Sequence, residues 1–178
     1  MYKITFGKYQ LIVHSPGLPA LYNEYIKHAK FADQIDIDKP EGTSAFLGIG
    51  YPNEWPFLAV AFRCIPGEKE TFHPGAIIIP ETEIVFIGGG ERLLAYDLNR
   101  PDRLWEDTVD TGFWSWAQHE QYVLMSAELE FAAWDIHANK IWSTFVEPPW
   151  SYDVKNDLVL LDVMGKVSEF NISEGPKI

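Results

Sequence analysis

Two short segments place large aromatic side chains two residues apart, at 114–116 (Trp-Ser-Trp) and 150–152 (Trp-Ser-Tyr). Alternate residues of a β-strand share a face, so each segment predicts an aromatic strip on a sheet. Such a strip can stack a sugar or anchor a partner protein, or it can pack between sheets as core. The candidate binding residues are Trp114, Trp116, Trp150 and Tyr152, with His119 beside them.

The titratable side chains predict neither a catalytic set nor a metal site. Two carboxylate–histidine pairs, Glu24 with His28 and Asp135 with His137, are each short of the three or four ligands that zinc requires. The remaining histidines, His14, His73 and His119, are scattered along the chain. We therefore expect no metal and no cofactor, and we interpret both pairs as surface contacts.

Glu128 and Glu130 are the nearest approach to an acid/base couple, because they are two residues apart near the tip of an expected hairpin. Solvated charge is the ordinary reason for carboxylates at such a tip. A nucleophile motif of the Gly-x-Ser-x-Gly kind is also missing from the sequence. A hydrolase that uses Glu128, Glu130 or His119 is therefore the last of three functional hypotheses.

The charge of the chain narrows the classes of partner. With 14 basic and 26 acidic residues the formal net charge is −12, which argues against nucleic acid and anionic membranes and permits a basic protein. The single cysteine, Cys64, lies in an apolar run and is expected to be a structural thiol. The first residues lack a secretory signal pattern and no apolar run reaches the ~20 residues that span a bilayer. We expect a cytoplasmic protein.

The elements that would carry these residues repeat along the C-terminal half of the chain. Apolar runs begin at Val85, Val123 and Val159, which are 38 and 36 positions apart. An aromatic-Asp step at 96–97 recurs at 134–135 and, as Phe-Asn, at 170–171. Trp105 is matched by Trp142, and we expect both to dock between neighbouring sheets. This period indicates small β-sheet units that stack on one another.

Residues 83–175 resemble the blade repeat of quinoprotein-type β-propellers, in which a strand is followed by Ala-x-Asp and then by a Trp eight residues after the Asp. Asp97 and Trp105 keep that interval of eight, and Asp135 and Trp142 have seven. The Thr-Gly turn of the family is replaced by Pro-Asp at 101–102 and by Ala-Asn at 138–139. The resemblance implies sheet architecture, and no cofactor ligand of the family is matched.

The segment before the repeats contains short apolar runs at 2–6, 9–14, 45–49, 57–64 and 76–79. One amphipathic stripe from Pro19 to about Ala32 predicts a helix, and alternation around Ile35 and Ile37 predicts an edge strand. The predicted fold is all-β with one N-terminal helix. It consists of three propeller-blade-like antiparallel repeats of 36–38 residues at 83–175, and residues 1–80 cap them within a single domain, 1–178. Dimerisation is the alternative means of covering the exposed edge.

Three functions remain open from the sequence. The first is a non-catalytic protein-interaction module, for example a small acidic inhibitor or immunity-type protein that neutralises a basic partner. The second is a carbohydrate-binding or small-ligand domain that uses the aromatic strip. The third is the hydrolase described above. Acidic charge, a repeat-built surface and aromatic rims favour the first.

Overall fold

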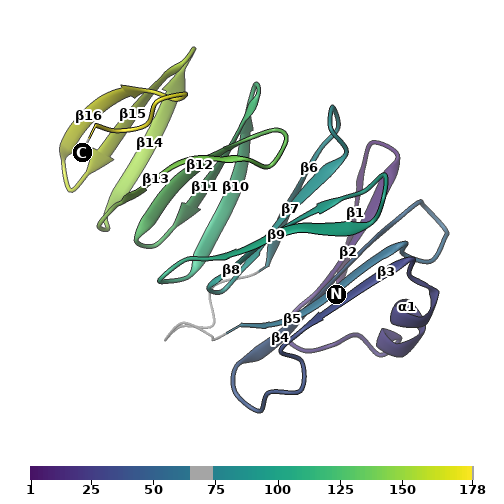
Figure 1. The fold of residues 1–178 in the computed structure, drawn as a ribbon. Coiled ribbons are helices and arrows are strands. Elements are labelled where there is room, and N and C mark those ends of the chain that lie inside the picture. Colours follow the sequence, from purple (N-terminus) through teal and green to yellow (C-terminus); the bar gives the residue numbers. More distant parts are fainter. Residues whose placement is uncertain (65–73, 178) are drawn as a thin grey trace.

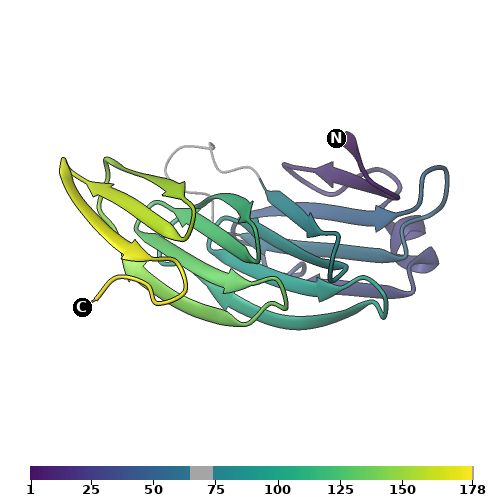
Figure 2. The same cartoon turned by 90° about the horizontal axis from the view of Figure 1, so that it is seen from above.

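Four β-sheets stack in a row that does not close into a ring (Figures 1 and 2). The computed structural model describes residues 1–64 and 74–177. We name the sheets A to D in chain order. Sheets B to D carry the repeats, and the chain passes from one sheet to the next along the row, with the C-terminus at the far end from the helix.

Sheets B, C and D are antiparallel meanders whose neighbouring strands follow one another in sequence. Sheet B contains β6 (Gly75–Ile79), β7 (Ile84–Gly89), β8 (Arg92–Asp97) and β9 (Asp102–Thr108). Sheet C contains β10 (Phe113–His119), β11 (Tyr122–Ala127), β12 (Glu130–Asp135) and β13 (Lys140–Phe145). Sheet D contains β14 (Trp150–Lys155), β15 (Leu158–Val163) and β16 (Lys166–Asn171).

Sheet A is built differently, from β1 (Tyr2–Phe6), β2 (Tyr9–His14), β3 (Phe31–Ile35), β4 (Thr43–Gly50) and β5 (Leu58–Cys64). Its strand order is β1-β2-β4-β5-β3, and β3 runs parallel to β5. The helix α1 (Tyr22–His28) covers its outer face, where Tyr25 stacks on Phe46 with ring centroids 5.2 Å apart.

The all-β class with one short N-terminal helix is confirmed, but the expected count of three sheets is wrong. Residues 1–64 form a fourth sheet of their own, because β2 pairs with β4 and β4 pairs with β5. Residues 75–79, which we assigned to the cap, form β6, the first strand of sheet B. Each repeat therefore begins one strand earlier than its apolar run suggests.

The helix is shorter at both ends than its apolar stripe predicted. The chain leaves the helix after His28, because the backbone N–H groups of Lys30 and Phe31 both donate to the carbonyl of Phe57. These bonds start the parallel pairing of β3 with β5. The predicted edge strand consequently begins at Phe31 and ends at Ile35, before Ile37.

The apolar runs of β7 and β11 lack a polar alternation because these two strands are buried on both faces. In β7, Val85 and Ile87 face the core between sheets A and B, whereas Phe86 faces the core between B and C. Val159 and Leu161 of β15 face only the core between C and D, since sheet D ends the row. The third copy of the repeat is less apolar because only one face of its sheet is buried.

The aromatic-Asp step of each repeat forms the same turn three times. The side chains of Asp97, Asp135 and Asn171 accept hydrogen bonds from backbone N–H groups two residues further on, at 2.7–2.9 Å. Such Asx turns fix the chain reversal after the third strand. The Asp or Asn therefore recurs in each repeat because its side chain is needed to form this turn.

Trp105 and Trp142 dock between neighbouring sheets, as predicted. The Trp105 ring lies parallel to Trp134 of sheet C at 5.6 Å, and its indole N–H donates to the carbonyl of Ala138 at 2.7 Å. Trp142 donates in the same way to the carbonyl of Ile172, at 2.6 Å. The repeat therefore places one indole hydrogen bond across each of the last two interfaces.

Polar contacts tie sheet A to sheet B. The hydroxyl of Tyr9 donates to the carboxylate of Glu83 at 3.0 Å, and that of Tyr96 donates to Asp33 at 3.0 Å. Burial, together with the hydrogen bond to Glu83, raises the pKa of Tyr9 to about 12. The guanidinium of Arg92 contacts Asp36 across the same interface.

Candidate functional site

Trp114 and Trp150 come from neighbouring sheets and stack face to face. Their ring centroids are 5.4 Å apart and their planes differ by 14°. Trp114 retains 40% of its surface exposed, whereas Trp150 is half-buried. The indole N–H of Trp150 donates to the carbonyl of Glu128 at 3.2 Å. Trp114 is therefore an accessible ring that packs against Trp150, and the hydrogen bond to Glu128 fixes the orientation of Trp150.

Trp116 does not share a face with Trp114, contrary to the prediction from their spacing. The β10–β11 register shifts between Phe113 and Ser115, so Trp114 is an extra residue in the strand. Phe113 and Trp116 both pack toward sheet B, and the Trp116 ring lies 5.3 Å from those of Phe86 and Trp134. A β-bulge of this kind re-aims side chains, and it splits the expected strip.

Trp150 and Tyr152 do share a face, as expected, and that face is packed against sheet C. Phe131 lies between them, with its centroid 5.4 Å from Trp150 and 4.5 Å from Tyr152. Burial raises the pKa of the Tyr152 hydroxyl. These two side chains are largely core of the C–D interface, and only Trp114 presents an exposed aromatic surface here.

His119 lies at the opposite end of β10 from Trp114. Its Nε2 is 2.7 Å from the carbonyl oxygen of Asn156, in the turn between β14 and β15. The structure thus does not bring His119 to the aromatic pair. It links sheets C and D at their other end.

Three backbone hydrogen bonds gather the loops around Trp114 into one rim. Glu128 donates its N–H to Gly112, Val146 donates to Leu129, and Met164 donates to Pro149. These loops carry the carboxylates of Asp110, Glu128 and Glu147, of which the first and last are exposed. We call Trp114 with these three acidic residues the Trp114 rim.

The carboxylate pairs of the sequence have separate structural roles. Glu24 and His28 are 3.5 Å apart on the surface of α1, as interpreted. The Asp135 carboxylate is occupied by the N–H groups of His137 and Asn139, at 2.9 and 2.8 Å. Burial alone would raise the pKa of Asp135, but hydrogen bonds from Asn139 and His137 outweigh it and lower that pKa.

Glu128 and Glu130 do not form a strand-borne pair. Glu128 lies in the turn before β12, and Glu130 opens that strand 3.6 Å from the Lys140 ammonium. Burial raises the pKa of Glu130, partly offset by Lys140. Within residues 1–64 and 74–177, no group of three or more His, Cys, Asp or Glu side chains is arranged to hold a metal; His73 lies outside these residues.

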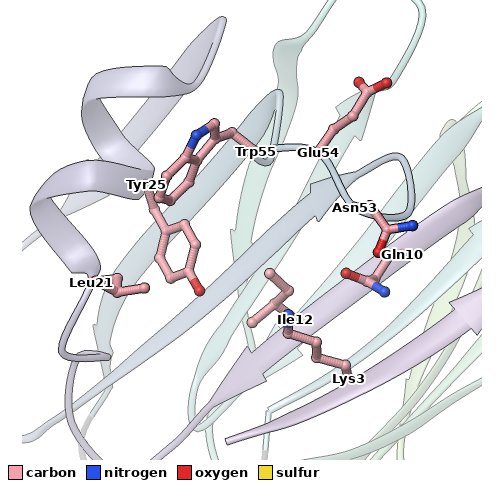
Figure 3. A pocket seen from close by; sticks show the side chains of 8 residues that line it. All are labelled: Lys3, Gln10, Ile12, Leu21, Tyr25, Asn53, Glu54 and Trp55. Carbon is pink, nitrogen blue, oxygen red and sulfur yellow. The ribbon is translucent and has the colours of Figure 1, made fainter.

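A cavity of about 730 Å³ lies on the outer side of sheet A, where sequence reasoning placed only a turn (Figure 3). Its lining comes from β1, β2, α1 and the loop between β4 and β5. Aromatic, aliphatic and polar side chains share it. They are Lys3, Gln10, Ile12, Leu21, Tyr25, Asn53, Glu54 and Trp55.

Trp55 is the exposed aromatic residue of this cavity, at 44%. His28 stacks on its ring at 4.7 Å and 11°, and Tyr25 meets it at a steep angle with centroids 5.6 Å apart. Both contacts come from α1, which therefore fixes the orientation of the indole. In the sequence, the one sign of this site is a tryptophan within a segment typical of an exposed turn, Tyr-Pro-Asn-Glu-Trp-Pro at 51–56.

Two glycines allow the loop that carries Trp55 to lie against β4. A Cβ at Gly48 would lie 2.9 Å from Pro56, and one at Gly50 would lie 3.0 Å from the carbonyl oxygen of Trp55. Asn53 adopts a φ of 67°, which asparagine tolerates better than most residues. The loop returns to the sheet where Phe57 donates its N–H to Ile49, at 2.9 Å.

Comparison with known proteins gives a fold likeness and no family. No family model and no curated protein matches the chain. Among solved structures, Kluyvelomyces marxianus Hsv2 matches with a TM-score of 0.41 and 9% identity over 77% of this chain and 48% of its own. Kluyveromyces lactis Hsv2 matches with a TM-score of 0.32 and 11% identity over 54% of this chain and 32% of its own.

Myxococcus xanthus glutaminyl cyclase is similar over 93% of this chain and 74% of its own, with a TM-score of 0.34 and 9% identity. The chain spans 32% and 48% of the length of the two Hsv2 structures. These similar structures have propeller-type folds. Because these TM-scores are below 0.5, the fold described above is established by the strand pairing alone.

None of the helices among the described residues is long and apolar enough to cross a membrane.

Proposed function

We propose that the chain is a non-catalytic protein-interaction module that binds a basic partner through the Trp114 rim. The observation that carries the proposal is the stacked pair, in which Trp150 holds Trp114 at 5.4 Å while 40% of Trp114 remains accessible. Tryptophan is enriched among residues that dominate binding energy at interfaces, and a ring already held in place loses less entropy on binding.

The charges around the pair support a basic partner. Asp110, Glu128 and Glu147 lie in the loops at the Trp114 end of sheets C and D, and the whole chain has a net charge of −12. Acidic residues at the margin of an interface speed association with a basic protein and make it sensitive to salt. A small inhibitor or immunity-type protein that neutralises a basic effector is one form that this function would take.

Affinity capture from a lysate of the source organism tests the proposal, followed by direct titration of the purified captured protein. The variants are Trp114→Ala and Glu128→Gln, and Trp55→Ala is the matched control because its indole is similarly exposed, at 44%, on sheet A. We expect a basic protein that binds wild type and Trp55→Ala and binds Trp114→Ala at least about tenfold more weakly. Equal binding by Trp114→Ala, or binding that salt does not weaken, would contradict the proposal.

A further inference from the structure

We infer that the cavity beside α1 is a second, separate binding site, and that it takes a neutral oligosaccharide. Its volume of about 730 Å³ lies within the range of small-molecule sites, about 300–1,000 Å³. It lies beside α1 on the outer face of sheet A. Figure 1 shows α1 at the end of the row opposite sheet D. The site is therefore independent of the Trp114 rim.

The Tyr25 hydroxyl is a polar group that opens onto the cavity, since it is not among the buried polar atoms of the described residues that lack a partner. Tyr25 is only 6% exposed, and its ring extends from α1 toward the strand that carries Ile12 (Figure 3). Among the described residues, the Tyr25 hydroxyl makes no hydrogen bond. A phenol hydroxyl both donates and accepts, so it can hydrogen-bond to a ligand hydroxyl in the cavity.

Amide side chains supply the remaining polar groups of the lining. Gln10 and Asn53 project from β2 and from the loop that carries Trp55 (Figure 3). Within the described ranges, neither amide makes a side-chain hydrogen bond. Each amide offers both a donor and an acceptor, which matches the dual character of a sugar hydroxyl.

The aromatic and charged residues select an uncharged, ring-shaped ligand. Trp55 is a flat apolar surface held in place by His28, and such a surface suits the C–H face of a sugar ring. The ammonium of Lys3 and the carboxylate of Glu54 offset each other, so the lining carries no net charge that would favour an anion or a cation. Together these features favour a neutral saccharide over a phosphate or a charged peptide.

Titration of the full chain with maltotriose, cellotriose, mannotriose and chitotriose tests the inference, by calorimetry and tryptophan fluorescence. Glycylglycine is the zwitterionic comparison probe. We expect at least one trisaccharide to bind wild type, and Trp55→Ala to weaken that binding at least about tenfold. Trp114→Ala is the control and should bind as wild type does.

Asn53→Gly provides a variant that keeps the backbone, because glycine accepts the φ of 67° while removing the amide. We expect it to weaken binding with an unchanged melting temperature, which separates loss of a ligand contact from loss of the fold. Binding of no trisaccharide, equal binding by Trp55→Ala, or binding of glycylglycine alone would each overturn the inference. None of these outcomes bears on capture of a protein by the Trp114 rim.

Discussion

The indole N–H of Trp142 donates to the backbone carbonyl of Ile172 at 2.6 Å, and so joins sheet C to the turn that follows β16 in sheet D. Trp105 makes the corresponding bond to Ala138, at 2.7 Å, between sheets B and C. Each bond satisfies a carbonyl at a chain reversal that would otherwise lose its partner on burial. Trp105 and Trp142, which occupy equivalent positions in the repeat, therefore act as structural staples: each joins two neighbouring sheets by a hydrogen bond.

Replacement of either staple by phenylalanine tests this role. Trp142→Phe keeps an aromatic ring but leaves the Ile172 carbonyl unpaired, and we expect the free energy of unfolding to fall by about 1–3 kcal/mol. Trp105→Phe should cost less, because Trp105 is less buried than Trp142. Urea unfolding measures both values. Trp114→Phe is the control. If it lowered the free energy of unfolding as much as Trp142→Phe does, the structural role of the Trp142 hydrogen bond would be contradicted.

Gly175 is the residue on which the Trp142 ring rests. A Cβ there would lie 2.6 Å from Cγ of Trp142, and the φ of Gly175 is +75°. We expect Gly175→Ala to destabilise the fold by about 2–4 kcal/mol, from overpacking together with left-handed strain. Gly165→Ala isolates the strain, since its φ is +81° with no atom within 4 Å. Equal melting temperatures for the two variants would show that the contact with Trp142 has no energetic weight.

Gly88 makes room for Phe113 at the junction of sheets B and C. A Cβ at Gly88 would lie 2.4 Å from the Phe113 ring, whereas a Cβ at Gly75 would lie 3.2 Å away. We expect Gly88→Ala to cost about 1–3 kcal/mol and Gly75→Ala to cost less. In a double-mutant cycle, Phe113→Leu should relieve part of the cost of Gly88→Ala. Strictly additive costs would show that the two residues are not coupled.

Asp135 and Glu130 should give pH dependences of opposite sign. The folded pKa of Asp135 is below its ordinary value of 3.8, so its stabilising contribution is present above that pH and is lost as pH falls through the folded pKa. The folded pKa of Glu130 is above 4.5, so the fold loses stability as pH rises from 4.5 through that pKa.

The variants Asp135→Asn and Glu130→Gln separate these two effects. Asp135→Asn should flatten the loss of stability below about pH 4, and Glu130→Gln should remove a loss that wild type shows above about pH 4.5. Urea midpoints measured from pH 3 to pH 7 would test both. Parallel profiles for wild type and Glu130→Gln would show that burial of this carboxylate carries no cost.

The sequence predicted the parts of the fold that depend on local pattern. Strands 2–6 and 9–14 and the repeated runs are where the sequence pattern placed them. The point at which each unit begins was not predictable, because a period of 36–38 residues is the same whichever strand is counted first. Sheet A, which the sequence did not predict as a separate sheet, depends on the pairing of β2 with β4. These strands are joined by a long connection, and no local sequence pattern indicates that they pair.

The candidate site was less predictable for a related reason. The single-residue bulge at Trp114 reverses the facing of Trp116, and a spacing rule assumes an unbroken strand. The cavity beside α1 joins residues as distant as Lys3 and Trp55, which are adjacent only after sheet A has formed. Its one local sign was a tryptophan in a turn otherwise composed of proline and polar residues.

The parallel pairing of β3 with β5 sets sheet A apart in the order of assembly. Sheets B, C and D join strands that are neighbours in sequence, so their contacts close short loops and form at small entropic cost. In sheet A, β5 must instead pair on one side with β4 and on the other with β3, which precedes β4 in the chain and is joined to β5 only through a long connection. We expect amide protons of the C-terminal sheets to gain protection first during refolding, with the α1 cavity assembled last.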